Sequence, residues 1–351
     1  METYLIGIDT SKHNFQACGV TRDGRKTFER KLNRSQVLSF VRGYRESRIA
    51  MEVGSGSHYW GRLFEKEGHK VLLLPASFVK PFVKSQKNDR NDAEAIAEAA
   101  LRPAMRFVPV KGVESQDIQN LHRVRDRLVA ARTAVVNQAR GLLAEYGVVI
   151  PQGITKFRSC LVELLPQLEG QLTRLTLSVL SSLQAELNFY DERIKGLNKQ
   201  VEDISEAHPV CKRLKEIPGV GVLSATAVVA ASTAPHEFKN GRQFAAWIGL
   251  VPRQYSTGGK SVLGRISKRG NPYLRKLLIH GARAVVCRAS EKLDERSRWV
   301  MSLRQRRGLH KTCVALANKN ARIIWHLLMK PDEHFRPSVV PQEIGAEVQA
   351  A

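Results

Sequence analysis

The sequence predicts an α/β domain at the N-terminus, then a long helical connector and a mostly helical C-terminal domain. Short apolar segments alternate with amphipathic ones over about residues 1–105, and helical spacing of apolar residues then runs from Glu114 to about His208. Basic residues and glycine turns interrupt the apolar pattern over residues 211–330. Because 351 residues is long for one compact unit, two domains and a connector are expected.

The N-terminal domain is expected to contain a mixed β-sheet. Residues 3–9 (TYLIGID) are typical of a buried strand, and residues 14–21 and 25–32 alternate like the strands of a hairpin with a turn at 22–24. Two further buried strands are expected at residues 48–54 and 69–75. Helices are expected at residues 35–44, with Asn33 or Ser35 as N-cap, and at residues 57–68 and 91–102. Three consecutive strands followed by alternating helix and strand indicate one α/β domain.

The connector, over about residues 106–210, is expected to be a pair of long helices. Residues 114–147 carry apolar residues at helical spacing, a loop with Pro151 and Gly153 follows, and residues 161–208 are again helical in pattern. Such a pair is typical of an antiparallel, coiled-coil-like stalk. Its apolar seam is either a monomer core or a dimer interface, and we favour oligomerisation. The tail over residues 331–351 is expected to be disordered.

Charge indicates nucleic acid as the partner. The chain is 43% hydrophobic and 25% charged, which is ordinary for a globular protein, but its formal net charge is +23. Residues 253–330 contain 19 Lys and Arg against three acidic residues. Such a surplus repels itself unless it faces a polyanion, whereas a merely solvated surface intersperses both signs. A membrane surface is the competing explanation.

Two other features narrow the class of protein. No apolar run approaches the roughly 18 residues of a membrane span, and the first residues lack a signal-peptide pattern, so a soluble cytoplasmic protein without a membrane partner is expected. The five cysteines are far apart and form no CxxC pair, which argues against a zinc site or a disulfide framework. Any metal is therefore expected to be held by carboxylates.

Four acidic residues stand where a divalent metal site needs them. Asp9 and Glu52 each end a predicted core strand, so they lie at one sheet edge if those strands pair. Asp89 and Asp92 are three residues apart at a helix start and share one face. Hard oxygen ligands suit Mg²⁺, and one or two ions so held activate the attacking oxygen at a phosphate and stabilise the leaving one.

Each acid also has a structural explanation, since Asp9 can close a turn and Asp89 or Asp92 can cap a helix. Four acids in this strand order nevertheless indicate a ribonuclease-H-like nuclease fold.

Three N-terminal motifs, GIDTSK, MEVGSGSHYW and KSQKNDRNDAEAIAEA, carry a close resemblance to the DEDD transposases of bacterial insertion sequences of the "one-ten" family. The later stretch from IPGVGVLSATAVVA to GRISKRGNPYLRKLLIHGARAVV is similar to the C-terminal domain of that family, particularly of its "eleven-eleven" branch. The resemblance covers about residues 3–328.

This resemblance implies a Holliday-junction-resolvase (RuvC-type) nuclease domain with Asp9, Glu52, Asp89 and Asp92 as its Mg²⁺-binding tetrad. It implies a bacterial, nucleoid-associated recombinase guided by a structured non-coding RNA of its own element, which pairs with donor and target DNA. It also implies a serine that links covalently to DNA, within a dimer or tetramer in which the carboxylates of one subunit meet the serine of another.

Residues 217–221 (IPGVG) lie between two helical patterns and are typical of a helix-hairpin-helix. Gly219 and Gly221 would then expose backbone amides at the next helix start to a phosphate. The alternative is an ordinary glycine turn between helices.

Residues 251–271 (VPRQYSTGGKSVLGRISKRGN) are the richest segment for chemistry. The two glycines after Ser256 and Thr257 let a hydroxyl approach a phosphodiester closely, and a serine ester would allow strands to rejoin without ATP. Spacing does not decide among Ser256, Thr257, Ser261 and Ser267, all of which have an alternative role as turn caps or phosphate ligands. The family pattern, with serine just before the glycine pair, favours Ser256 as the nucleophile, although Thr257 directly precedes the glycines here.

Basic side chains of the C-terminal domain are expected to neutralise the reacting phosphate and to position a nucleic-acid backbone without reading its sequence. They are Lys260, Arg265, Lys268, Arg269, Arg275, Lys276, Arg283, Arg304, Arg306 and Arg307.

Three hypotheses therefore stand. The first is the RNA-guided recombinase, which needs both the tetrad and the serine. The second is a metal-dependent nuclease similar to a junction resolvase, without covalent serine chemistry. The third is a non-catalytic nucleic-acid-binding protein, against which the intact tetrad argues. A covalent protein–DNA adduct would separate the first two.

Overall fold

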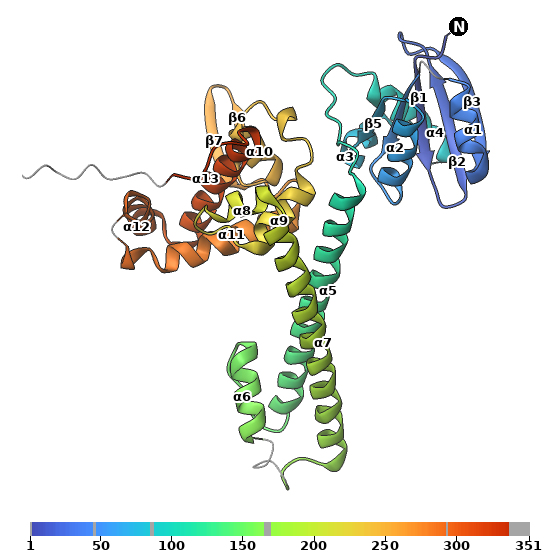
Figure 1. Cartoon of the computed structure of the whole chain (residues 1–351). Helices are drawn as coiled ribbons and strands as arrows, with labels where there is room; N and C mark the ends of the chain where they lie inside the picture. Colours follow the sequence, from blue (N-terminus) through green and yellow to red (C-terminus); the bar gives the residue numbers. More distant parts are fainter. Residues whose placement is uncertain (1, 45–46, 85–87, 165–169, 293, 337–351) are drawn as a thin grey trace, which may run out of the picture. The chain divides into compact units, whose positions relative to one another are not determined.

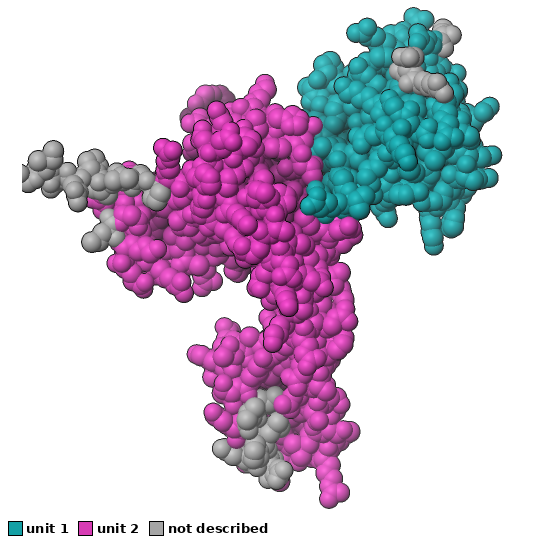
Figure 2. Space-filling view, in the orientation of Figure 1, with its two compact units in different colours: residues 1–116 teal, residues 117–351 magenta. Residues whose placement is uncertain are grey.

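The computed structural model describes residues 2–44, 47–84, 88–164, 170–292 and 294–336. The chain divides into two compact units, residues 1–116 and 117–351, which Figure 2 colours separately. Unit 1 holds the α/β elements. Unit 2 contains most of the connector and the whole C-terminal segment.

Unit 1 is built around the strands β1 (Leu5–Thr10), β2 (Asn14–Val20), β3 (Lys26–Asn33), β4 (Arg48–Glu52) and β5 (Val71–Leu74). They form one sheet in the order β3-β2-β1-β4-β5. β1, β2 and β3 pair antiparallel, whereas β4 is parallel to β1 and β5 is parallel to β4. The predicted mixed sheet is confirmed, and its order is consistent with a ribonuclease-H-like, RuvC-type fold.

Helices cover both faces of this sheet (Figure 1). Leu5 and Ala50 pack with Ile96 on one face and Ile8 packs with Phe64 on the other, because successive side chains of a strand point to opposite faces. The first face is covered by α4 (Asp89–Ala100), preceded by α3 (Ala76–Val79) and η2 (Lys80–Phe82). The second is covered by η1 (Arg34–Gln36), α1 (Val37–Arg42) and α2 (Ser57–Lys66).

Two asparagines determine where helices of unit 1 begin. Asn33, one of the two predicted N-caps, precedes η1, and its backbone N–H donates to the Gln36 side chain at 2.9 Å. Asn88 caps α4 by accepting a hydrogen bond from the Asn91 backbone at 2.9 Å. Because α4 begins two residues before the predicted start, Asp89 and Asp92 both lie in its first turn.

The connector is an antiparallel pair of long helices, α5 (Val113–Ala144) and α7 (Arg174–Ala207). Polar contacts join rising residue numbers on α5 and in the turn after it to falling ones on α7: Arg125–Asn198 at 2.6 Å, Arg132–Asp191 at 2.9 Å and, from the turn, Tyr146–Thr176 at 2.6 Å. Buried residues of α7 recur every seven positions, at Leu180, Leu187, Ile194 and Val201. One seam of α7 therefore faces its neighbour along the whole pair.

The prediction of one continuous helix over residues 161–208 is wrong. α6 (Ile154–Leu164) begins inside the expected loop, and residues 170–173 are not helical. Gly170 has a φ of 98°, and the Thr173 side chain accepts a hydrogen bond from the Thr176 backbone at 3.2 Å, which starts α7 afresh. The buried Phe157 of α6 packs in one cluster with residues of α5 and α7.

The C-terminal part of unit 2 is a helical cluster around one apolar core, as predicted. Its elements are α8 (Pro209–Lys215), α9 (Val222–Ala231), η4 (Pro235–Glu237), α10 (Gly241–Ile248), α11 (Pro272–Cys287), η5 (Ala289–Glu291), α12 (Glu295–Arg307) and α13 (Leu309–Met329). Residues 331–336 pack on this cluster: the Phe335 ring lies against the core and its backbone N–H donates to Glu216 at 2.9 Å. The rest of the tail expected to be disordered, residues 337–351, lies outside the described residues.

One β-hairpin within this helical cluster was not predicted. β6 (Pro252–Thr257) and β7 (Lys260–Ile266) pair antiparallel and project from the helices (Figure 1). Gly258 and Gly259 join them with φ angles of 54° and 76°. Positive φ at both central residues is what a type I′ hairpin turn requires, so the glycine pair has a structural reason here.

Among the described residues, no helix combines the length and the apolar character needed to cross a bilayer.

Candidate catalytic site and nucleic-acid surface

Alternation along the strands places Asp9 and Glu52 on the face of the sheet that α4 covers. Leu5, Gly7 and Asp9 share one side of β1, and Leu5 belongs to the core beneath α4. Glu52 is in the same relation to Ala50 on β4. The parallel register pairs Ile8 with Met51. Asp9 and Glu52, the next residues of these two adjacent strands, therefore lie at neighbouring positions at one end of the sheet.

Gly7 allows α4 to lie directly on β1. A Cβ at this position would lie 2.5 Å from the Ala93 carbonyl oxygen and 2.7 Å from the Ala97 backbone nitrogen. Only a glycine permits this close approach of helix and strand backbones. The first turn of α4, with Asp89 and Asp92, is thereby held near the end of β1.

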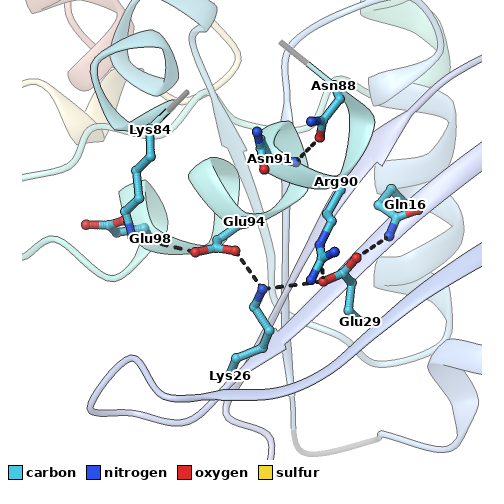
Figure 3. Close-up of polar contacts among 9 residues, drawn as sticks. All are labelled: Gln16, Lys26, Glu29, Lys84, Asn88, Arg90, Asn91, Glu94 and Glu98. Carbon is cyan, nitrogen blue, oxygen red and sulfur yellow. Dashed lines mark hydrogen bonds and ion pairs between the residues drawn. The ribbon is translucent and has the colours of Figure 1, made fainter. Parts of the chain in front are cut away.

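A network of ion pairs fixes α4 across β2 and β3 (Figure 3). The Arg90 guanidinium binds Glu29 of β3 at 2.7 Å, and Lys26 of β3 binds Glu94 of α4 at 2.6 Å. Further along the helix, Lys84 binds Glu98 at 3.0 Å. These partly exposed pairs contribute little stability singly, but the first two join the helix that carries two of the four acids to β3, and the third joins it to the segment that precedes it.

The four predicted acids are electrostatically coupled. The pKa of Asp9 is raised to about 6, mainly by burial and then by the negative charges of Asp92, Asp89 and Glu52, in that order of size. Asp9, Glu52 and Asp92 are half-buried, whereas Asp89 is exposed. The fold therefore brings together the four carboxylates that the sequence placed far apart, and their charges repel one another.

The chemistry of this set fits a divalent cation, because it offers only hard oxygen donors and a cation would relieve the repulsion at Asp9. Within the described part of the chain, no three His, Cys, Asp or Glu side chains are close enough to hold one ion as they stand. The acids would therefore have to turn toward a common point on binding a cation.

Ser256, the predicted nucleophile, lies on the exposed hairpin. It pairs across the strands with Ser261, and the Gln254 side chain donates a hydrogen bond to its Oγ at 2.7 Å. Thr257 pairs with Lys260 beside the turn, on the opposite face. Residues 252–266 contain no Asp, Glu or His, so the hairpin itself supplies no general base for a serine.

The glycine turn between α8 and α9 is explained first by packing. A Cβ on Gly281 of α11 would lie 1.9 Å from the Gly219 carbonyl oxygen, so the turn and α11 touch backbone to backbone. The Pro218 carbonyl accepts hydrogen bonds from Asn320 at 3.0 Å and Arg296 at 3.2 Å. Gly221 is exposed at the start of α9, with open space where a side chain would lie.

The predicted basic contacts fall into two groups. Arg275 and Lys276 have partners: Arg275 donates to the Ile248 and Arg269 carbonyls at 2.9 Å, and Lys276 pairs with Asp126. The other group is exposed, apart from the half-buried Arg304, and comprises Lys260, Arg265, Lys268, Arg269, Arg283, Arg304, Arg306 and Arg307. Lys268 has a φ of 53°, the one positive φ outside glycine among the described residues.

One buried polar residue was not predicted. His122 of α5 lies 2.9 Å from the Tyr273 hydroxyl and 3.0 Å from the Thr226 hydroxyl. Thr226 donates to the Val222 carbonyl at 2.8 Å, so it accepts from His122 Nε2–H, and Tyr273 donates to Nδ1. Burial lowers the pKa of His122 to about 4. A neutral histidine thus joins the connector to α9 and α11, and the only sequence signal was a histidine within an apolar helical pattern.

Comparison with known proteins identifies the family of the chain. Residues 6–148 match the DEDD transposase domain model, described as a transposase, and residues 211–298 match the model of the IS116/IS110/IS902 transposase family. A DEDD transposase domain indicates dependence on a divalent metal ion.

Full-length relatives extend the match over nearly the whole chain. A "Probable family 20 transposase" of Pseudomonas aeruginosa is 47% identical over 345 residues, covering 96% of this chain and 100% of that protein. The transposase for insertion sequence element IS1111A of Coxiella burnetii is 45% identical over 330 residues, covering 94% and 91%. The chain therefore belongs to the IS116/IS110/IS902 family of insertion-sequence transposases, enzymes of DNA strand transfer.

Proposed function

We propose that this transposase cleaves and rejoins DNA with two groups: the acids Asp9, Glu52, Asp89 and Asp92, and the hydroxyl of Ser256. The observation that carries the proposal is the coupling of the four acids at one end of the sheet. Mg²⁺, the proposed ion, would neutralise charge developing on the phosphate oxygens. Its ligands would come from these four acids, and any of the four that does not bind the ion would be free to accept a proton.

The serine step exchanges a phosphodiester bond of the DNA for a phosphoserine ester. Ser256 Oγ attacks the phosphorus, a phosphoserine ester forms, and the bond from phosphorus to one DNA oxygen breaks. That oxygen leaves as a DNA hydroxyl after taking a proton, and the serine proton passes to a carboxylate. In the return step a DNA hydroxyl attacks the ester and frees the serine, so no ATP is needed.

The base for Ser256 has to come from another part of the protein, since residues 252–266 contain no carboxylate or imidazole. We propose that the acids of unit 1 serve it, from a second copy of the chain within a dimer or tetramer. The exposure of every residue of β6 supports this, because a projecting hairpin can enter a partner's site. The α5–α7 pair, proposed as a coiled-coil-like stalk, is the candidate oligomerisation element.

Sequence specificity is proposed to reside in a structured guide RNA of the same element that pairs with donor and target DNA. The net charge of +23 supports binding of such RNA together with DNA. The helix-hairpin-helix role of residues 217–221 stays a proposal, carried by the exposed Gly221 at the start of α9.

The test of the serine is direct. DNA carrying a nick that prevents rejoining should trap the ester, and trypsin should then release the modified peptide 254–260 (QYSTGGK), distinct from the peptide 261–265 that carries Ser261. Ser256→Ala should abolish the adduct, whereas the control Thr257→Val should retain it. An adduct that persists in Ser256→Ala would refute the assignment.

A second candidate function is a metal-dependent nuclease like a junction resolvase, in which the C-terminal cluster only binds DNA. The absence of a base in the hairpin favours it. Mg²⁺-dependent cleavage without any adduct would establish it. RNA that copurifies with the protein from cells carrying the whole element should be one discrete transcript if the enzyme is guided, and random cellular RNA if it is not.

A further inference from the structure

A groove of about 1070 Å³ runs along one face of α13 in unit 2. Positions 311, 315, 319, 322 and 326 of α13 line it at spacings of three and four residues. Such spacing defines one face of a helix, here opposite the buried face that includes Leu316, Ala317 and Ile324. The sequence pattern of α13 therefore supplies one wall of the groove.

The lining is strongly cationic. Arg242, Lys311, Lys319 and Arg322 are exposed along the groove, His326 stands at its end, and no Asp or Glu contributes to the lining. In the described ranges, none of the first four forms an ion pair with an acid, whereas His326 binds Glu333 at 2.6 Å. Four cations without an acidic partner on one short surface attract an anionic ligand.

The floor of the groove is apolar and aromatic. Trp299 and Trp325 are half-buried there, beside Leu250 and Ile323. The Trp325 indole N–H donates to the Pro235 carbonyl at 3.0 Å, which fixes its ring, and Lys319 Nζ lies 4.8 Å from the centre of the Trp299 ring. A ligand for this groove therefore combines spaced negative charges with flat apolar groups.

We propose that the groove binds a single-stranded segment of nucleic acid, with phosphates on Arg242, Lys311, Lys319 and Arg322 and unpaired bases against the tryptophan floor. Duplex DNA matches less well, because its bases are stacked inside and it would offer only phosphates to an apolar floor. The volume is at the upper limit of the roughly 300–1,000 Å³ of small-molecule pockets, and a polymer segment fits an open groove of this size better.

The groove lies next to the hairpin β6–β7. Pro252 and Ile266, which also line it, are the first residue of β6 and the last of β7. A strand held in the groove therefore reaches the root of the hairpin that carries Ser256. The inference goes beyond the proposed chemistry and depends neither on the guide RNA nor on the serine, because it is a statement about binding.

The test measures binding of the full chain to fluorescent 15-nucleotide single-stranded DNA and RNA and to the matching DNA duplex. Lys319→Ala/Arg322→Ala should weaken single-strand binding at least tenfold and reduce the salt slope by about 1.4, since each single-strand phosphate contact contributes about 0.7. The charge-matched control Lys292→Ala/Lys330→Ala alters two exposed lysines of the same unit outside the groove and should bind like the wild type.

Photocrosslinking of a strand that contains 5-bromouracil gives a second readout. Crosslinks to Trp299 or Trp325 support the proposal. The proposal is overturned if groove and control variants bind equally well, or if crosslinks are confined to residues outside the groove. Displacement of the strand by an acidic peptide at equal charge concentration would also overturn it, in favour of a protein ligand. Loss of binding in the groove variants together with absent cleavage in the wild type would refute the proposed function alone.

Discussion

The close approach of α4 to β1 makes Gly7→Ala a sharp perturbation of the acid cluster. The added Cβ would lie 2.5 Å from the Ala93 carbonyl oxygen, and ordinary contact begins at 3.4 Å. The Ala93 carbonyl and the Ala97 amide, which would lie 2.7 Å from the new Cβ, are both backbone groups, so neither can rotate away from it. The helix must therefore move by about 0.9 Å, and overpacking of this kind costs about 1–3 kcal/mol of unfolding free energy.

The same shift displaces Asp89 and Asp92 relative to Asp9. A misplacement near 1 Å at a catalytic site costs about 100-fold in rate. We therefore expect Gly7→Ala to fold, to bind nucleic acid like the wild type and to cleave about 100-fold more slowly. The assay is single-turnover strand cleavage with Mg²⁺, together with urea unfolding.

Gly112→Ala is the matched control, because Gly112 is an exposed glycine of unit 1 with open space around its Cβ position. It should change neither stability nor cleavage. The reasoning is refuted if Gly7→Ala cleaves at the wild-type rate with unchanged stability, since α4 would then not be held by this contact.

Two further predictions concern unit 2. The pKa of His122 in the folded state, about 4, lies below its ordinary value of 6.5, so the unfolded chain binds the proton first as pH falls. The free energy of unfolding should therefore fall by about 3 kcal/mol between pH 6.5 and pH 4. Urea unfolding should show a flatter pH profile for His122→Gln but not for the exposed His280→Gln. Gly281→Ala should lower the melting temperature of unit 2, because its Cβ would lie 1.9 Å from the Gly219 carbonyl oxygen. Gly196→Ala, in an exposed and open stretch of α7, should raise the melting temperature slightly. Equal melting temperatures of the two variants would contradict the conclusion that close packing explains the glycine turn.

Local pattern was sufficient to predict the sheet and the strand ends on which Asp9 and Glu52 lie. β1, β4 and β5 are short apolar runs, β2 and β3 alternate, and the alternation from Leu5 to Asp9 fixes which face the acid occupies. The ion pairs between Arg90 and Glu29 and between Lys26 and Glu94 could not be predicted, because they join residues about 60 to 70 positions apart.

The hairpin and the helix break were missed for different reasons. The glycine pair at 258–259 is a recognisable two-residue turn signal, but the flanking residues are exposed on both faces and show no alternation. The break before Arg174 follows from the positive φ of Gly170 and the Thr173 cap, which a helical count of apolar residues does not register. The α13 groove depends on residues of five separate elements, α10, β6, β7, α12 and α13, which only the tertiary fold brings together.

We propose above that the four acids of unit 1 form the metal-dependent catalytic site. The measurement that tests it most directly is Mg²⁺-dependent strand cleavage by Asp9→Asn and Asp92→Asn, with nucleic-acid binding measured in parallel. Asp23→Asn is the control, because Asp23 lies in the turn at the opposite end of the sheet and pairs with Arg25. The account predicts that the first two variants bind like the wild type and do not cleave, whereas the control does both. Cleavage by Asp9→Asn at the wild-type rate would contradict it.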